Sequence, residues 1–423
     1  MNFVSLQYAV FLCAILFVYW RMGRSQQHLL LLVASYGFYA CWNWQFLSLI
    51  LISSLTDFIV GAKIYRAQTP TARRNWLIVT LIINFSILGY FKYANFFIDS
   101  ARDLLHGLGF DSHFGSLDIL LPVGISFYTF QSISYSIDIY RRELTPTHRL
   151  IDFLMFVAFF PQLVAGPIVR AREFLFQMST PRVFAWNNMQ TGVQLILTGL
   201  VKKAVIADTL AIHLVDPIFA QPEQFATSTL WLGAIAYAVQ IYCDFSGYSN
   251  IAIGSALLFG FHLPENFRFP YLAKNFSDFW TRWHITMSRF FRDYVYIPLG
   301  GNRRGPTRNL LNLASTTVVS GLWHGAAWTF VLWGIVHGLL LIGQRTLALR
   351  LRSIAPLIVK FVLFQVLLVL TWVLFRAGTI ALAFDYIMAL FTFQNGESIE
   401  TSALIWFCFG LFVIDHLYGL HPQ

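Results

Sequence analysis

Charged residues are scarce in this chain. They make up 12% of its 423 residues, while 57% of the residues are hydrophobic and the mean hydropathy is +0.61. Soluble domains carry about 25% charged residues, so a soluble enzyme of this length is excluded. The apolar runs are continuous rather than alternating, which favours membrane-spanning helices over a barrel. The sequence predicts an all-α, polytopic membrane protein.

Cysteine is also rare, and the four residues Cys13, Cys41, Cys243 and Cys408 form no CxxC pair. Neither a disulfide framework nor a metal site is predicted. Acidic residues are fewer than basic ones, 20 against 29, for a net charge of +9. Such an excess usually reflects cytoplasmic loops near anionic lipids, although an anionic substrate would also be attracted. No bound cofactor and no nucleic-acid partner are indicated.

The N-terminal third alternates between apolar runs and charged loops. Five spans are expected, at roughly 3–20, 28–41, 46–62, 76–97 and 120–140. Basic residues follow the first, third and fifth runs, whereas the loop at 98–118 is acidic, so the N-terminus is predicted to lie outside the cytoplasm. The first run has no basic residue before it and no cleavage site after it, so we expect a retained span.

The acidic loop contains a short motif, His106 to Asp111, that matches the HxxxxD pattern of soluble acyltransferases. It lies in a glycine-rich loop on the predicted outer side, away from any coenzyme supply. Short motifs need a matching structural context, so we interpret this one as a coincidence.

Polar and broken segments appear further along. Phe159–Pro167 has two prolines and a glycine at membrane depth, where a broken backbone must be covered by protein or line a cavity. Lys202 and Lys203 interrupt an apolar run, and we expect them to extend toward the membrane surface. Asp244 ends another apolar helix and is expected to pair with a histidine or an arginine.

The segment at 275–308 is rich in arginine. Between positions 281 and 308 the arginines are 282, 289, 292, 303, 304 and 308. Arg282, Arg289 and Arg292 recur at helical spacing and are expected to share one helix face. Such a helix should lie at the interface or in a protein-lined recess. Arginine suits phosphate and pyrophosphate, so the cluster is predicted to bind a nucleotide-bearing donor, with lipid phosphates as the alternative.

One histidine, His324, lies in a long apolar segment at 321–334. An ionisable group inside a membrane is by default a candidate functional site, although a packing role is the alternative. His337 follows thirteen residues later and is expected on another side of the same helix, with a structural role.

Longer motifs resemble the membrane-bound O-acyltransferase family, and within it the bacterial branch that acetylates exopolysaccharides such as alginate. The motifs, which follow in one order along nearly the whole chain, are 121–131, 160–167, 242–249, 264–267, 279–286, 292–301 and 323–325.

The resemblance implies a ring of transmembrane helices. We expect roughly ten to eleven spans, with re-entrant or interfacial helices, around a central funnel or tunnel. A single domain, 1–423, would comprise N-terminal spans at 1–140, a catalytic core at 150–345 and C-terminal spans at 355–423. The chain stops at Gln423, earlier than polysaccharide-acetylating members usually do, so we expect missing terminal helices or a shorter subgroup such as the D-alanyl-transferring branch.

The resemblance also implies a central histidine, His324, and a second one, His284. A neutral imidazole, with an unperturbed pKa of about 6.5, can remove the proton of an attacking hydroxyl, which accelerates transfer about 10²- to 10⁴-fold. Burial disfavours its charged form. Hydrogen-bond donors to the developing oxyanion would accelerate the transfer further, and the candidate donors are Trp323, Asn309 and His284. The predicted substrate-binding residues are Arg282, Arg289, Arg292, Trp323, Asn309 and Asp244.

The function so implied is transfer of an acetyl group from cytoplasmic acetyl-CoA, or another acyl thioester, across the bacterial inner membrane to an extracytoplasmic polysaccharide such as alginate. A periplasmic acetyltransferase resembling SGNH hydrolases would complete the modification. Crowding by Trp323, Trp328 and Trp333 would favour a short acyl chain. Alternatives are D-alanyl or peptidoglycan O-acyl transfer, a transporter, which the absence of an internal repeat disfavours, and a scaffold of an export complex.

Overall fold

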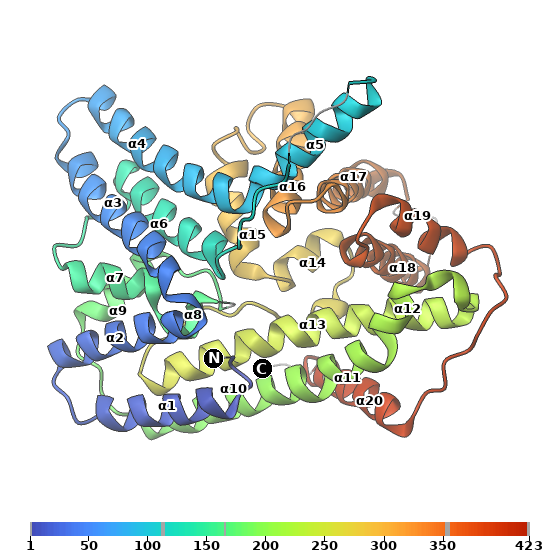
Figure 1. Ribbon diagram of the computed structural model, residues 1–423, viewed down its shortest axis with the longest axis horizontal. Coiled ribbons are helices and arrows are strands. Elements are labelled where there is room, and N and C mark those ends of the chain that lie inside the picture. Colours follow the sequence, from blue (N-terminus) through green and yellow to red (C-terminus); the bar gives the residue numbers. More distant parts are fainter. Residues whose placement is uncertain (1, 111–114, 165, 352–355, 421–423) are drawn as a thin grey trace. The chain divides into compact units, whose positions relative to one another are not determined.

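The computed structural model describes residues 2–110, 115–164, 166–351 and 356–420, and the regular elements in these ranges are helices (Figure 1). The all-α fold class is confirmed. An isolated bridge between Phe225 and Glu397 is the one strand-like pairing in these ranges. Asp111 of the HxxxxD motif, Ala165 of the broken-helix motif and the final residues 421–423 lie outside the described residues.

The chain divides into two compact units. One consists of Met1–Ile196 and Ile251–Pro264, and the other of Leu197–Asn250 and Glu265–Gln423. The boundary falls inside the 150–345 segment that was expected to form the catalytic core.

The first unit begins with nine helices. They are α1 (Leu6–Tyr19), α2 (Arg24–Asn43), α3 (Leu47–Arg66), α4 (Pro70–Leu88), α5 (Ala94–Gly107), α6 (Ile125–Tyr140), α7 (Leu150–Ala158), α8 (Phe160–Leu163) and α9 (Ala171–Ser179). Helices occupy all five segments predicted as spans. The Thr69 hydroxyl caps α4 by accepting from the Ala72 N–H at 3.1 Å, and Pro70 fills the first helical position. A π-helical turn, Gly89–Tyr93, carries α4 on into α5.

Three helical stretches among the described residues are long and apolar enough to cross a membrane: Arg24–Arg66, Pro70–Gly107 and Leu357–Arg376. The chain is therefore a multi-pass membrane protein. The predicted total of ten or eleven spans and the central funnel stay predictions. The break at Phe159–Pro167 is confirmed, because α7 ends at Ala158 and α8 stops at Leu163.

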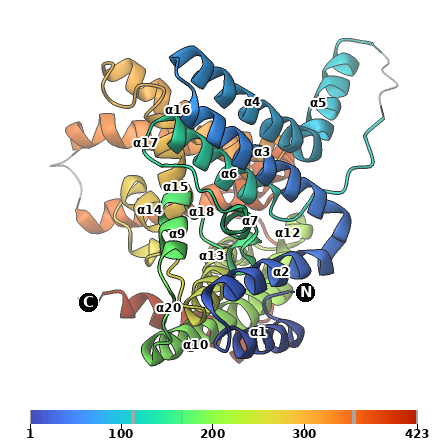
Figure 2. The ribbon, with the colours of Figure 1, turned by 90° about the vertical axis from the view of Figure 1, so that its left-hand side faces the viewer.

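A buried carboxyl group joins α3, α4 and α6, which lie side by side in Figure 2. Asp57 of α3 accepts hydrogen bonds from Thr80 Oγ1 at 2.5 Å, from Asn84 Nδ2 at 2.8 Å and from Ser136 Oγ. A buried carboxyl group is tolerated only when its hydrogen bonds are satisfied, and here the two neighbouring helices α4 and α6 provide the donors. No motif in the sequence points to Asp57.

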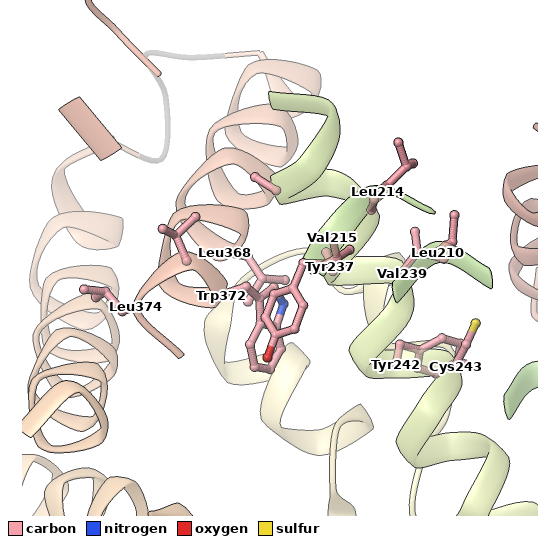
Figure 3. Packing of buried hydrophobic residues seen from close by; sticks show 14 of the residues in the cluster. Leu210, Leu214, Val215, Tyr237, Val239, Tyr242, Cys243, Leu368, Trp372 and Leu374 are labelled. Atoms are coloured by element: carbon pink, nitrogen blue, oxygen red, sulfur yellow. The ribbon is translucent and has the colours of Figure 1, made fainter. Parts of the chain in front are cut away.

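The remaining helices belong mainly to the second unit, although two of them, at 186–200 and 227–258, cross the unit boundaries after Ile196 and after Asn250. After α10 (Trp186–Leu200) come α11 (Asp208–Leu210), α12 (Asp216–Ala220), α13 (Thr227–Leu258), α14 (Phe276–Arg282), α15 (Ile285–Phe291), α16 (Pro306–His324), α17 (Trp328–Leu351), α18 (Leu357–Arg376), α19 (Ile380–Ala389) and α20 (Ala403–Tyr418). Their core is formed by buried side chains of several helices. Figure 3 shows Leu210, Val215, Tyr237, Tyr242 and Trp372 among them.

Helices α16 and α17 form a close hairpin. A Cβ atom on Gly321 would lie 2.2 Å from the Phe330 carbonyl oxygen, and one on Gly334 would lie 2.5 Å from the Thr317 carbonyl oxygen. Only glycine permits this approach of the two backbones. The expectation of one continuous helix through His324 and His337 is wrong, because Gly325 adopts an extended conformation and ends α16.

The prediction that Lys202 and Lys203 extend to the membrane surface is also wrong. They lie near the middle of a continuous helical run, 186–220, too far from either end for their stems to reach out. Lys202 is 8% exposed, and its Nζ lies 2.8 Å from Asp415 Oδ1. Lys203 Nζ lies 2.5 Å from Asp244 Oδ1, so the partner of Asp244 is a lysine rather than the expected histidine or arginine.

Candidate active site

His324 is the last residue of α16 and stands at the turn of the α16–α17 hairpin. Its ring centroid lies 5.0 Å from that of Trp323, 5.3 Å from that of Trp333 and 5.2 Å from that of Phe375. An aromatic wall from three helical segments therefore surrounds the imidazole. Trp328, which was also expected to narrow the space here, is 55% exposed.

His284 lies in the turn between α14 and α15, and its ring centroid is 6.3 Å from that of His324. It is fully buried, and neither ring nitrogen has a hydrogen-bond partner among the described residues. Its backbone is left-handed, with φ 42° and ψ 54°, a conformation that costs a non-glycine residue about 1–3 kcal/mol. Trp323 contacts both histidine rings, since its centroid is 5.8 Å from that of His284.

The expected single helix face for Arg282, Arg289 and Arg292 is wrong, because α14 ends at Arg282 and the turn at His284 separates it from α15. Arg282 Nε lies 2.8 Å from Asp278 Oδ1. Burial opposes ionisation of this carboxyl group, but the hydrogen bonds from Arg282 and from the Lys274 N–H prevail and hold the pKa of Asp278 below its usual value.

A basic pocket of about 670 Å³ opens beside the start of α16, and we call it the outer pocket. Four arginines contribute to its lining: Arg292, Arg303, Arg304 and Arg345. Asn309 also lines it, accepting hydrogen bonds from Tyr296 Oη at 2.5 Å and from Arg345 Nη1 at 3.2 Å. Several guanidinium groups around one pocket suit a phosphate-bearing ligand.

A second, mainly apolar pocket of about 300 Å³ shares Arg292, Tyr296 and Arg345 with the outer pocket, and we call it the inner pocket. Its further lining includes Trp280, Met287, Phe291, Leu313, Leu341, Trp333 and His337. Because the Trp333 ring also contacts the His324 ring, the inner pocket ends one side chain away from that histidine.

His337 was expected to have only a structural role, yet it lines the inner pocket. The Thr371 hydroxyl donates to the Leu368 carbonyl oxygen at 2.7 Å, so His337 Nε2–H is the donor in its 3.1 Å hydrogen bond to Thr371 Oγ1. This contact fixes the ring against α18.

The structure brings together three of the predicted site residues: His324, His284 and Trp323. Arg292 and Asn309 line the outer pocket, whereas Arg282, Arg289 and Asp244 line neither pocket. The interpretation of Asn309 as an oxyanion donor is wrong, since fifteen residues of α16, about 22 Å along its axis, separate it from His324.

Sequence reasoning missed Arg345, because its place beside Arg292 depends on how α17 folds back along α16. The described residues contain no group of three His, Cys, Asp or Glu side chains that could hold a metal ion. The arrangement provides an arginine-lined pocket, a mainly apolar pocket that shares residues with it, and two neighbouring imidazoles, of which His324 contacts the pocket residue Trp333.

Comparisons with known proteins give consistent matches. A sequence model of the membrane-bound O-acyltransferase family matches residues 141–357. The probable alginate O-acetylase AlgI of Pseudomonas aeruginosa is 43% identical over 394 residues, which cover 92% of this chain and 75% of that protein. The peptidoglycan O-acetyltransferase of Helicobacter pylori is 38% identical over 82% of this chain and 70% of its own length. The teichoic acid D-alanyltransferase of Streptococcus thermophilus is 31% identical over 53% of this chain and 57% of its own length.

Proposed function

The chain belongs to the membrane-bound O-acyltransferase family and is an O-acyltransferase, and from this premise we propose that it transfers an acetyl group from cytoplasmic acetyl-CoA toward an extracytoplasmic polysaccharide. The observation that carries the proposal is the pair of rings, His324 and His284, beyond the inner end of an arginine-lined recess.

The donor occupies both pockets in this proposal. Arg292, Arg303, Arg304 and Arg345 bind the phosphates of coenzyme A in the outer pocket. The thioester arm extends through the inner pocket, whose aromatic and aliphatic lining suits a slender chain without charge. The acetyl group then lies near Trp333 and His324.

The chemistry is a direct exchange of ester bonds. The hydroxyl oxygen of the acceptor attacks the thioester carbonyl carbon while His324 removes the hydroxyl proton. The carbon–sulfur bond breaks as the intermediate collapses, and the proton passes to the departing thiolate, so coenzyme A leaves as a free thiol. His284 donates a hydrogen bond to the oxyanion that develops on the carbonyl oxygen, since its ring nitrogens have no other partner among the described residues.

Access from both membrane faces is part of the proposal. The 20-residue helix α18 is about 30 Å long, which matches the hydrocarbon core of a bilayer. The basic residues around the outer pocket favour a cytoplasmic position for that end of the unit. At the other end of α18, Arg376 pairs with Asp216 at 2.9 Å and lines a separate pocket of about 260 Å³. We propose the bacterial inner membrane as the location, with a central funnel between ten or eleven spans.

The acceptor is inferred from the relatives. Identity of 43% over 92% of the chain supports acetylation of an alginate-like polysaccharide above peptidoglycan acetylation or D-alanyl transfer. Delivery through a periplasmic acetyltransferase of the SGNH-hydrolase type is the route that we propose. A transporter or a scaffold needs neither paired imidazoles nor a donor pocket.

The test is release of free thiol from acetyl-CoA by the purified protein in lipid nanodiscs. His324→Ala should abolish release while folded yield stays normal, because losing a base lowers the rate rather than the stability. His284→Ala should impair release strongly, whereas His213→Ala, at an exposed position, should leave it unchanged. Absence of release by the wild-type protein, or equal loss of folding and activity in His324→Ala, contradicts the proposal.

A further inference from the structure

The left-handed turn at His284 is held by a segment outside the two short helices that flank it. The Arg268 N–H donates to the Arg282 carbonyl oxygen at 2.8 Å, and the Ile285 N–H donates to the Asn266 carbonyl oxygen at 2.9 Å. These two backbone hydrogen bonds bracket His284 on both sides. Segment 266–268 therefore sets the backbone conformation from which the imidazole projects.

The Asn266 side chain adds further hydrogen bonds that hold the turn at His284. Its Oδ1 accepts from the Thr286 hydroxyl at 2.9 Å and from the Thr286 N–H at 3.4 Å, and its Nδ2 donates to Ser249 Oγ at 3.1 Å. Asn266 is 1% exposed, so water does not compete for these groups. One buried amide thus connects α13, through Ser249, to the first turn of α15.

The next residue, Phe267, packs against the His284 ring. Its ring is nearly parallel to that of His284, at a centroid distance of 6.4 Å and an angle of 15°, and it packs edge-on against Phe245 at 5.0 Å. The Phe245 ring in turn contacts the His284 ring at 4.7 Å. Displacement of Asn266 would therefore disturb both the backbone of His284 and the rings around it.

A histidine that takes part in catalysis is usually oriented by a hydrogen bond to one of its ring nitrogens. Among the described residues, His284 has no such bond. Its orientation depends on the turn and on ring packing alone. We propose that Asn266 is a positioning residue that acts through His284 in the acyl transfer, an inference that rests on the proposed function.

The kinetic test compares Asn266→Ala with the matched variant Asn84→Ala. Asn84 is likewise 1% exposed and hydrogen-bonded to Asp57, but it belongs to the other unit. Asn266→Ala should lower kcat about 10²-fold, the effect of misplacing a reacting group by about 1 Å. Its KM for acetyl-CoA should change little, because the donor pockets stay intact. Asn84→Ala should lower the melting temperature without a comparable loss of kcat.

Two further variants separate positioning from stability. In a His284→Ala background, Asn266→Ala should cause no additional loss of kcat, since its effect passes through the absent imidazole. Asn266→Asp keeps the oxygen that accepts from Thr286 and should recover most of the rate. The proposal is overturned if the loss of kcat in the double variant equals the product of the losses in the two single variants. It is also overturned if Asn266→Ala loses no more kcat than Asn84→Ala. Ser249→Ala, with a smaller loss expected, replaces Asn266→Ala if that variant does not fold.

An introduced cysteine tests the geometry of the turn independently of activity. If the wild-type protein releases no coenzyme A thiol, the proposed function is refuted, but this test of the turn can still be made. In protein lacking the four native cysteines, His284→Cys should react slowly with N-ethylmaleimide, because the position is fully buried. Adding Asn266→Ala should raise the reaction rate several-fold as the turn opens, whereas adding Asn84→Ala should not. An unchanged rate on adding Asn266→Ala overturns the positioning role.

Discussion

Replacing Arg345 tests the assignment of the donor pocket most directly. Arg345 lines both the outer and the inner pocket, and one of its guanidinium N–H groups donates a hydrogen bond to the neutral side chain of Asn309. A hydrogen bond to a charged group contributes about 1.5–3 kcal/mol, and solvent screening at this exposed position favours the lower part of that range. Arg345→Gln should therefore raise the KM for acetyl-CoA about 10- to 30-fold. The kcat should change less than about twofold, because binding is lost equally in the ground and transition states.

The assay is continuous detection of free thiol over a range of acetyl-CoA concentrations, and two controls sharpen it. Arg282→Gln should leave KM nearly unchanged, because Arg282 pairs with Asp278 and lines neither pocket. With S-acetylpantetheine, which lacks the nucleotide phosphates, wild-type protein and Arg345→Gln should behave alike. Equal KM increases for Arg345→Gln and Arg282→Gln, or a loss of kcat alone in Arg345→Gln, would refute the pocket assignment.

Three more outcomes follow from the packing and the loop charges. Gly321→Ala should cost about 1–3 kcal/mol of stability and lower thiol release, measured by differential scanning fluorimetry and the activity assay, because its Cβ would overlap α17. Asp415→Ala should destabilise the protein by about 3–5 kcal/mol, because it leaves the charge of the buried Lys202 without its partner. Lys202→Met combined with Asp415→Leu should recover part of this loss. An unaltered melting temperature of Asp415→Ala contradicts the prediction. In cysteine-free protein in spheroplasts, Ser116→Cys should react with an impermeant thiol reagent and Thr69→Cys should not, and the reverse pattern would invert the topology.

Local patterns in the sequence determined where the helices lie. The apolar runs that end near Arg66 and Tyr140 are helical in the structure, since run length and hydrophobicity are properties of consecutive residues. The break at Phe159–Pro167 was likewise predicted from proline and glycine. His324 stood out because an ionisable residue inside an apolar run is rare whatever surrounds it, and the motif resemblance identified His284 as its companion.

The tertiary structure alone decided which side chains meet. Lys202 pairs with Asp415 across 213 positions of sequence, and Asp57 receives donors from two other helices. The turn at Gly325 sends α17 back along α16 and brings Arg345 beside Arg292. Helical periodicity records which residues share a face of one helix, but it holds no information on which faces oppose each other. Those contacts arise only when the hairpin closes, and they determine which arginines form the donor pocket.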